Sequence, residues 1–390
     1  MSNSNQSNEP AGYTLWQLML YFLRLGTLGF GGPVALVGFM HRDLVEERKW
    51  ITEADYKEGL ALAQIAPGPL AAQLAIYLGF VHHRILGATV AAFAFVLPSF
   101  LMVVGLGMAY VSYGGLPWMQ AVFYGVGAAV LGIMAIGAHK LSTKSIGKDK
   151  LLWAIFAALA IVTIVTQSEI AWLFIGSGIL VWIVRCKPKF GNASWAVAMP
   201  TQIPQVLPVL ADPGLVLQIG LFFAKAGAFV FGSGLAIVPF LYGGVVTEHH
   251  WLNDRQFVDA VAVAMITPGP VVITTGFIGY LIAGLQGASI AAAATFLPCY
   301  LVTIIAAPHF KKWGKNLSVI AFVDGITAAA IGAIAGSVVV IAQRSITDVP
   351  TAILAVGTTA LLWKFKKIPE PFVVIGAALI GVALYPLTHP

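Results

Sequence analysis

The chain has 390 residues, of which 59% are hydrophobic and only 10% are charged. A soluble domain usually has about 25% charged residues, so this composition excludes nearly all soluble enzymes and predicts an integral membrane protein embedded in the lipid bilayer. The net charge of +6 does not indicate nucleic-acid binding, because the basic residues fall in short connections between apolar segments. The two cysteines are far apart in the sequence and predict neither a disulfide framework nor a metal site.

In chain order, the sequence divides into a polar tail (1–13), an N-terminal membrane repeat (14–185), a Pro-rich linker (186–214) and a C-terminal membrane repeat (215–390). Backbone polar groups in lipid must be satisfied internally, so the apolar segments are expected to be α-helices. These segments cover 14–40, 59–81, 85–111, 117–138, 151–167, 169–185, 215–242, 256–282, 285–307, 318–342, 351–363 and 371–388. The predicted fold class is an all-α polytopic membrane protein.

The two repeats are copies of one another. With a shift of 201 residues, Phe22–Pro69 aligns with Phe223–Pro270 without a gap, and 16 of the 48 positions are identical. After one deletion the shift becomes 200, and Pro98 then aligns with Pro298. An internal duplication of this kind is the usual construction of secondary transporters.

The distribution of basic residues indicates how the copies are oriented. Lys and Arg follow the second, fourth and sixth apolar segments of the first copy, but the third and fifth segments of the second copy. Cytoplasmic loops collect Lys and Arg, so the halves are expected to have inverted topology. If all six segments of the first copy crossed the membrane, the second copy would start on the same side as the first. Twelve simple crossings therefore do not allow an inversion. Either one Pro/Gly-broken segment in each half is re-entrant, or residues 193–211 also cross the membrane, and the sequence leaves both open.

A Pro-Gly-Pro motif interrupts an apolar segment in each copy: Pro67, Gly68 and Pro69 in the first, and Pro268, Gly269 and Pro270 in the second. Proline breaks a helix because it lacks an N–H group and clashes with the preceding turn. The half-helix that follows has unpaired N–H groups and a positive dipole end, which favour an anion. We expect the two breaks to meet near the membrane midplane as a substrate site, with Gln64 and Thr267 as polar neighbours.

A second pair of motifs lies upstream, F-G-G-P in the first copy and F-G-S-G in the second. Their small residues either let backbones approach closely or let a broken backbone face a ligand. Gly31, Gly32, Gly232 and Ser233 are therefore candidate substrate-binding residues, and Ser233 adds a hydroxyl donor.

Three charged residues lie within apolar segments. Arg24 and Lys225 are equivalent in the duplication, and a charge inside the membrane usually faces a cavity or a partner. We expect these two cations to help bind a multiply charged anion. Asp324 could pair with either cation or carry a proton.

Glu47 and Glu248 are also equivalent in the duplication, and each lies in a polar connection before a Pro-Gly-Pro break. They are candidates for coupling or gating, together with Asp324. No nucleophile with its base, P-loop or dinucleotide loop is recognisable, so no enzyme activity, cofactor or ATP-driven pumping is expected.

The motifs F-G-G-P, W-I-T and A-P-G-P, followed by F-G-S-G, W-L and T-P-G-P, resemble those of the chromate transporter family. The resemblance extends from about Leu15 to the end, and the length is similar to that of the two-domain members. It implies a bacterial inner-membrane protein that exports chromate and confers chromate resistance, although family members can handle sulfate or another oxyanion. The arginine of the family matches Arg24, whereas Lys225 departs from it, so the halves are not interchangeable.

Several functions remain open at this stage. The favoured one is a secondary transporter that exports chromate by alternating access around the broken helices. Proton coupling is left open, as is a homodimer. The alternatives are an importer or exchanger of sulfate or another oxyanion, a passive anion channel, and a membrane-embedded enzyme or lipid scramblase.

Overall fold

The computed structural model describes most of both repeats. The described residues are 12–30, 32–113, 117–166, 171–186, 214–232, 234, 237–310, 316–346, 348–365, 368 and 370–388. The stretch 193–211, nearly all of the polar tail, Gly31 and Ser233 lie outside these residues. The expectations for those parts of the chain are therefore not addressed by the structure.

The regular elements among the described residues are helices apart from two short strands, which agrees with the predicted all-helical class. The first repeat contains α1 (Leu15–Leu28), α2 (Gly32–Met40), η1 (His41–Glu47), α3 (Glu53–Ile65), β1 (Gly68–Pro69), α4 (Leu70–Tyr113), α5 (Pro117–Ser145), α6 (Lys150–Thr166) and α7 (Ala171–Cys186). The second contains α8 (Leu215–Ala228), β2 (Phe231–Gly232), α9 (Ile237–Tyr242), η3 (Gly243–Glu248), α10 (Asp254–Ile266), η4 (Val271–Ile273), α11 (Thr274–Ala306), η5 (Ala307–His309), α13 (Leu317–Ser345), α14 (Val349–Lys364) and α15 (Glu370–Thr388).

Both α4 and α11 contain a sharp turn that divides them into a short and a long helix. Arg84 has φ 51° and ψ −140°, and Gly284 has φ 60° and ψ −149°. Backbone angles of this kind reverse the chain rather than continue a helix. The turns occupy equivalent positions in the duplication, so each repeat has a short helix after its Pro-Gly-Pro motif and a long helix after the turn.

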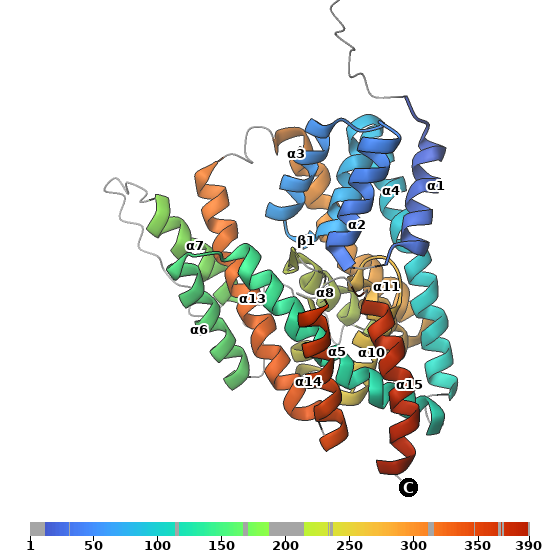
Figure 1. The fold of residues 1–390 in the computed structure, drawn as a ribbon. Helices are drawn as coiled ribbons and strands as arrows, with labels where there is room; N and C mark the ends of the chain where they lie inside the picture. The colour runs from blue at the N-terminus through green and yellow to red at the C-terminus, as the bar shows by residue number, and fades with distance from the viewer. Residues whose placement is uncertain are drawn as a thin grey trace, which may run out of the picture.

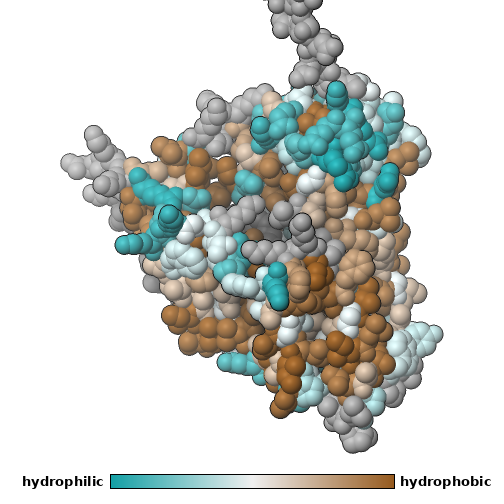
Figure 2. All heavy atoms as spheres, in the orientation of Figure 1, coloured by the Kyte–Doolittle hydropathy of each residue, from teal (hydrophilic) through white to brown (hydrophobic). Residues whose placement is uncertain are grey.

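Among the described residues, four helical stretches are long and apolar enough to cross a membrane: Leu70–Tyr113, Trp118–Thr143, Val271–His309 and Leu317–Gln343. The first and third of these include the sharp turns at Arg84 and Gly284. Five shorter apolar helices accompany them. Figure 2 shows hydrophilic side chains gathered at the upper end of the view, over the charged segment 41–58, and hydrophobic side chains over the flank beneath it. This surface fits a multi-pass membrane protein.

The two repeats are intertwined rather than separate packing units. Helix α5 of the first repeat packs against α14 and α15 of the second. Helix α13 of the second packs against α6 and α7 of the first, on the left of the view in Figure 1. Gly125 permits close approach to the carbonyl of Ala377, and its equivalent Gly325 permits close approach to the carbonyl of Ser177. Each repeat therefore makes the same helix contacts with the other, as the two subunits of a symmetric dimer do.

Candidate functional site

The two Pro-Gly-Pro motifs interrupt the helices as their residue types require. Helix α3 ends at Ile65 and α10 ends at Ile266, and the residues that follow, Ala66 and Thr267, are extended. A residue before proline is excluded from the helical region by the proline ring. The glycine between the prolines has φ +140° at Gly68 and φ +92° at Gly269, values that residues with a Cβ rarely adopt.

The breaks of one repeat contact the small-residue loops of the other. Strand β1 pairs in parallel with β2, and the Gly68 N–H donates to the carbonyl oxygen of Val230 at 2.5 Å. Reciprocally, the Gly269 N–H donates to the carbonyl oxygen of Gly29 at 3.0 Å. Gly68 and Gly269, like Gly29 and Val230, are equivalent under the shift of 201 residues. The duplication therefore produces a symmetric meeting of four loops.

We call this meeting the central junction and define it by the residues 29–30, 66–69, 230–232 and 267–270. Figure 1 shows α1, α2 and α3 in the upper part of the view, α8 and α10 beneath them, and β1 in between. Ala66 and Thr267 are buried, with exposed fractions of 6% and 8%. The two breaks therefore lie inside the protein, where four helical ends converge from two sides, whereas Phe30 at the edge of the junction is 39% exposed.

Two glycines let the long helices reach the junction. A Cβ on Gly26 of α1 would overlap the carbonyl oxygen of Phe95 in α4, and a Cβ on its equivalent Gly227 of α8 would overlap that of Thr295 in α11. Only glycine permits backbones to approach this closely. Helices α1 and α8 thus lie directly on the long helices that follow the breaks.

The first proline carbonyl of each break is held by a different side chain. In the first repeat, the Gln73 amide donates to the Pro67 carbonyl at 2.7 Å. In the second, the hydroxyl of Ser99, a buried residue of α4 in the other repeat, donates to the Pro268 carbonyl at 2.8 Å. Cys299 is equivalent to Ser99, but its thiol donates to the Phe296 carbonyl instead. The breaks are therefore symmetric in backbone and asymmetric in their side-chain support.

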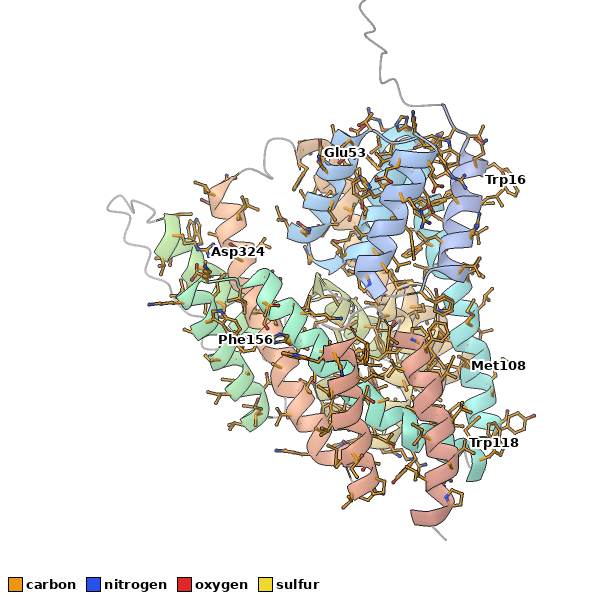
Figure 3. The ribbon with its side chains drawn as sticks, viewed as in Figure 1. Trp16, Glu53, Met108, Trp118, Phe156 and Asp324 are labelled. Carbon is orange, nitrogen blue, oxygen red and sulfur yellow. The ribbon has the colours of Figure 1, made fainter. Side chains whose placement is uncertain are left out.

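Arg24 and Lys225 both lie on exposed helix faces, five residues before the junction. Each follows apolar residues at helical spacing: Trp16 and Leu20 precede Arg24, and Leu217 and Leu221 precede Lys225. Figure 3 shows Trp16 on the outer side of α1, pointing away from the other helices.

Neither cation forms an ion pair with any described residue. The Lys225 ammonium lies 5.7 Å from the centre of the Phe240 ring. Since both helices run toward the junction, the cations lie within about one and a half turns, or roughly 8 Å along the axis, of its loops.

The other predicted binding residues occupy varied positions. Gly232 is part of β2, and Gly32 begins α2. Gln64 is exposed in the last turn of α3. The Thr267 hydroxyl donates to the carbonyl oxygens of Val263 and Ala264 within α10. Its hydrogen-bonding capacity therefore serves the helix end. Gly232 belongs to the junction, and Gly32 begins the helix that follows residues 29–30 in the chain.

Asp324 pairs with neither Arg24 nor Lys225, which corrects the pairing that the sequence suggested. Its carboxylate accepts a hydrogen bond from Arg185 at 2.5 Å, and Arg185 also donates to Asp149 at 2.6 Å. All three side chains are about one-third exposed. Figure 3 shows Asp324 beside the end of α7. Because Arg185 lies 139 residues away in the sequence, local pattern did not reveal this partner.

Glu47 and Glu248 end the π-helical segments η1 and η3, so the structure preserves their equivalence. The Glu47 side chain is 63% exposed and forms a 3.5 Å ion pair with Arg42. Glu248 is also exposed. Neither side chain reaches the buried part of the molecule.

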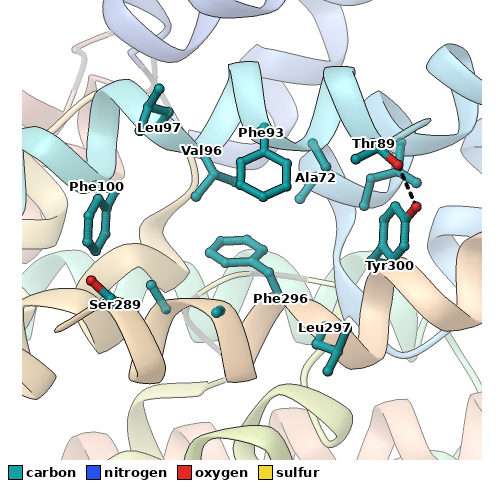
Figure 4. A pocket seen from close by; sticks show the side chains of 14 residues that line it. Ala72, Thr89, Phe93, Val96, Leu97, Phe100, Ser289, Phe296, Leu297 and Tyr300 are labelled. Carbon is teal, nitrogen blue, oxygen red and sulfur yellow. Dashed lines mark hydrogen bonds between the residues drawn. The ribbon is translucent and has the colours of Figure 1, made fainter. Parts of the chain in front are cut away.

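A cavity of about 450 Å³ lies between α4 and α11, as Figure 4 shows. Its lining contains no charged side chain, so it does not suit a dianion. Polar groups meet at one end, where the hydroxyls of Thr89 and Tyr300 lie 2.6 Å apart. The lining contains both members of six equivalent pairs: Thr89 and Ser289, Ala92 and Ala292, Phe93 and Ala293, Val96 and Phe296, Leu97 and Leu297, Phe100 and Tyr300. The two helices contribute them in opposite order along the cavity, since Thr89 meets Tyr300 at one end and Phe100 lies near Ser289 at the other (Figure 4). Both repeats therefore contribute equivalent residues to the walls of this cavity.

A buried carboxyl group that was not predicted as a site residue lies on α10, the helix that leads to the second break. Asp259 of α10 is 3% exposed, and its Oδ2 accepts a hydrogen bond from the Tyr110 hydroxyl at 2.8 Å. The signal was present, since Asp259 aligns with Glu58 and belongs to an otherwise apolar stretch. Its partner on α4 was not visible, because 149 residues separate the two.

The chain matches the model of the family described as "Chromate transporter" twice, over residues 16–182 and 217–382. It is 69% identical to the chromate transport protein of Cupriavidus metallidurans, over 97% of this chain and 95% of that protein. It is 59% identical to the probable chromate transport protein of Synechococcus elongatus, over 97% of each chain, and 30% identical to the chromate transport protein of Pseudomonas aeruginosa, over 95% of this chain and 92% of that protein. No solved structure gives a significant match. The two family matches and these full-length relatives establish that the chain belongs to the chromate transporter family.

Proposed function

We propose that this protein transports chromate out of the cell across the bacterial inner membrane and binds the anion at the central junction. The identity to chromate transport proteins over nearly the whole chain supports the substrate. The proposal for the site rests on the reciprocal contacts of Gly68 with Val230 and of Gly269 with Gly29. They bring two interrupted helices together at one buried place.

The physical basis is the charge of helix ends. A half-helix begins directly after each break, and its first N–H groups have no partner within the helix. Together with the helix dipole they favour a negative charge by about 0.3–1 kcal/mol per end at exposed sites, and by more where solvent is excluded. A tetrahedral dianion that loses its hydration needs several such groups. In this proposal the side chains of Arg24 and Lys225, which lie on exposed faces of α1 and α8, turn toward the junction when the anion binds. They then supply the formal charge that the backbone lacks, Arg24 by a bidentate fork and Lys225 by a point charge.

We further propose that the repeats are inverted in the membrane and that the helix pairs leading into the junction are re-entrant. The duplicated breaks and the exchange of α6, α7, α14 and α15 between repeats support a two-fold axis through the cavity between α4 and α11. Alternating access then moves the elements around the junction against the long helices. The charged segment 41–58 would face the cytoplasm.

Electrical energy favours export. Moving one charge across 100 mV is worth about 2.3 kcal/mol, so a dianion that leaves a cell with a negative interior gains about 4.6 kcal/mol per 100 mV. Export therefore needs no ATP. Uptake of sulfate or another dianion would have to overcome the same energy and would require a coupled cation.

The test is uptake of labelled chromate into everted membrane vesicles, at matched protein levels. Arg24→Ala and Lys225→Ala should each weaken chromate binding about 10- to 100-fold, since a hydrogen bond to a charged group contributes about 1.5–3 kcal/mol. Lys57→Ala removes a cation that is 71% exposed on α3 and serves as the control.

Full transport by both site variants would contradict the paired-cation site. Excess sulfate is added to measure whether it competes with chromate for transport. A current that does not saturate as the chromate concentration rises would indicate a channel instead of a transporter.

A further inference from the structure

Asp259 is the one acidic residue that is buried among the described residues, and it forms no ion pair with any of them. Its side chain lies in a stretch of nine consecutive buried residues of α10, from Phe257 to Met265. Among described residues, its hydrogen-bond partner is Tyr110 of α4, at 2.8 Å. A buried carboxylate with a single neutral donor is costly, because desolvation disfavours the charged form.

The groups around this carboxyl are few. Helix α10 packs against α4, α5, α11, α13 and α15. From all of these helices, the titratable or charged groups that act on Asp259 are Tyr110 of α4 and, on its own helix, Arg255. Arg255 precedes Asp259 by one turn but is exposed. The carboxyl therefore sits between a phenol in the core and a cation in solvent, and no ion pair fixes it in the charged state.

The equivalent position in the first repeat is built differently. Glu58 of α3 is only half-buried and hydrogen-bonds to Tyr77, which belongs to its own repeat. Asp259 instead bonds across the repeats to α4, and the residue equivalent to Tyr110 is Phe310, which has no hydroxyl. Of these two equivalent positions, only that of Asp259 therefore has a buried acid bonded to a phenol of the other repeat, and the duplication alone does not explain this difference.

Asp259 is also well placed to act on the site. It lies eight residues, about 12 Å along a helix, before Thr267 and the break whose Gly269 N–H contacts Gly29. A change in charge at Asp259 alters how stably α10 packs on α4. Because α10 leads directly into the second break, a change in how α10 packs also shifts the break.

We propose that Asp259 is the proton-binding residue that couples chromate export to proton entry, with Tyr110 as the partner that sets its protonation. This rests on the proposed export of chromate. In each cycle Asp259 takes a proton while its surroundings face the outside, carries it in the neutral form while buried, and releases it to the cytoplasm. The proton enters and leaves as such, so no oxidant or further reactant is needed.

The test uses the purified full-length protein in liposomes that contain a pH-sensitive dye. Two quantities are measured: net chromate flux with its proton flux, and exchange of labelled for unlabelled chromate at equal concentrations. Wild-type chromate flux should move protons in the opposite direction. Asp259→Asn, which mimics the protonated acid, should retain exchange and lose both proton flux and the response to a pH gradient. Glu58→Gln is the matched control and should keep both.

Tyr110→Phe provides a second readout that does not depend on the folding of Asp259→Asn. Loss of the phenol donor destabilises the carboxylate, so the pH profile of transport should shift upward by about one unit. Proton-coupled flux in Asp259→Asn, or an unshifted profile in Tyr110→Phe, would overturn the proposal. Chromate transport by the wild type without any proton flux would also overturn it and would leave the proposed export intact. Absence of chromate transport in the wild type would instead contradict the proposed export.

Discussion

Replacing Gly269 by alanine tests whether the central junction depends on glycine. Gly269 has φ +92°, and a Cβ there would overlap Oγ of the buried Ser99. That hydroxyl donates to the Pro268 carbonyl at 2.8 Å. The substitution therefore adds backbone strain and also displaces the side chain that supports the break.

The magnitude follows from these two effects. A left-handed backbone conformation costs a residue with a Cβ about 1–2 kcal/mol. Overpacking of a filled site costs about 1–3 kcal/mol. Gly269→Ala should therefore lower the free energy of unfolding by roughly 2–5 kcal/mol. Gly147 also has a positive φ, 57°, but no atom lies within 4 Å of the Cβ position. Gly147→Ala should therefore show the backbone cost alone.

The assay is unfolding in mixed detergent micelles, with chromate transport measured on the same preparations. Ser99→Ala removes the overlapping oxygen, so Gly269→Ala should cost less in that background than in the wild type. A double-mutant cycle isolates this coupling. Equal costs for Gly269→Ala and Gly147→Ala, or a cycle with no coupling, would refute the packing of Ser99 against the second break.

Two further predictions concern contacts away from the breaks. Gly227→Ala should destabilise the protein by about 1–3 kcal/mol in the same unfolding assay, because the new Cβ overlaps a backbone carbonyl. Gly220→Ala in the same helix is the control: its Cβ meets only a side chain, at 3.4 Å, so it should be neutral or stabilising. Arg185→Gln should cost less than about 1 kcal/mol at pH 7, since the pair is about one-third exposed. The Arg185 guanidinium holds the pKa of Asp149 below its usual value, so this difference should be present above pH 4 and disappear as the pH falls through the lowered pKa. A cost that persists in acid would contradict that assignment.

Local chemistry made the helix breaks predictable. Two prolines around a glycine exclude a continuous helix whatever surrounds them, and Gly68 and Gly269 have positive φ. The two breaks were predicted to meet near the membrane midplane. The sequence did not reveal that each break contacts the small-residue loop of the other repeat. The phenol that bonds Asp259 and the arginine that bonds Asp324 were not predicted either. A partner more than a hundred residues away leaves no trace in the periodicity of a single helix.

The sequence by itself determined that this is a helical membrane protein with two copies of one unit. Scarcity of charge governs partitioning into lipid, and an internal repeat is visible from residue identities alone. Only the tertiary structure decided that α6 and α7 pack against the second repeat, and that Gln73 holds one break while Ser99 holds the other. These choices depend on which side chains fill the space between helices, and that space exists only after both repeats have folded together.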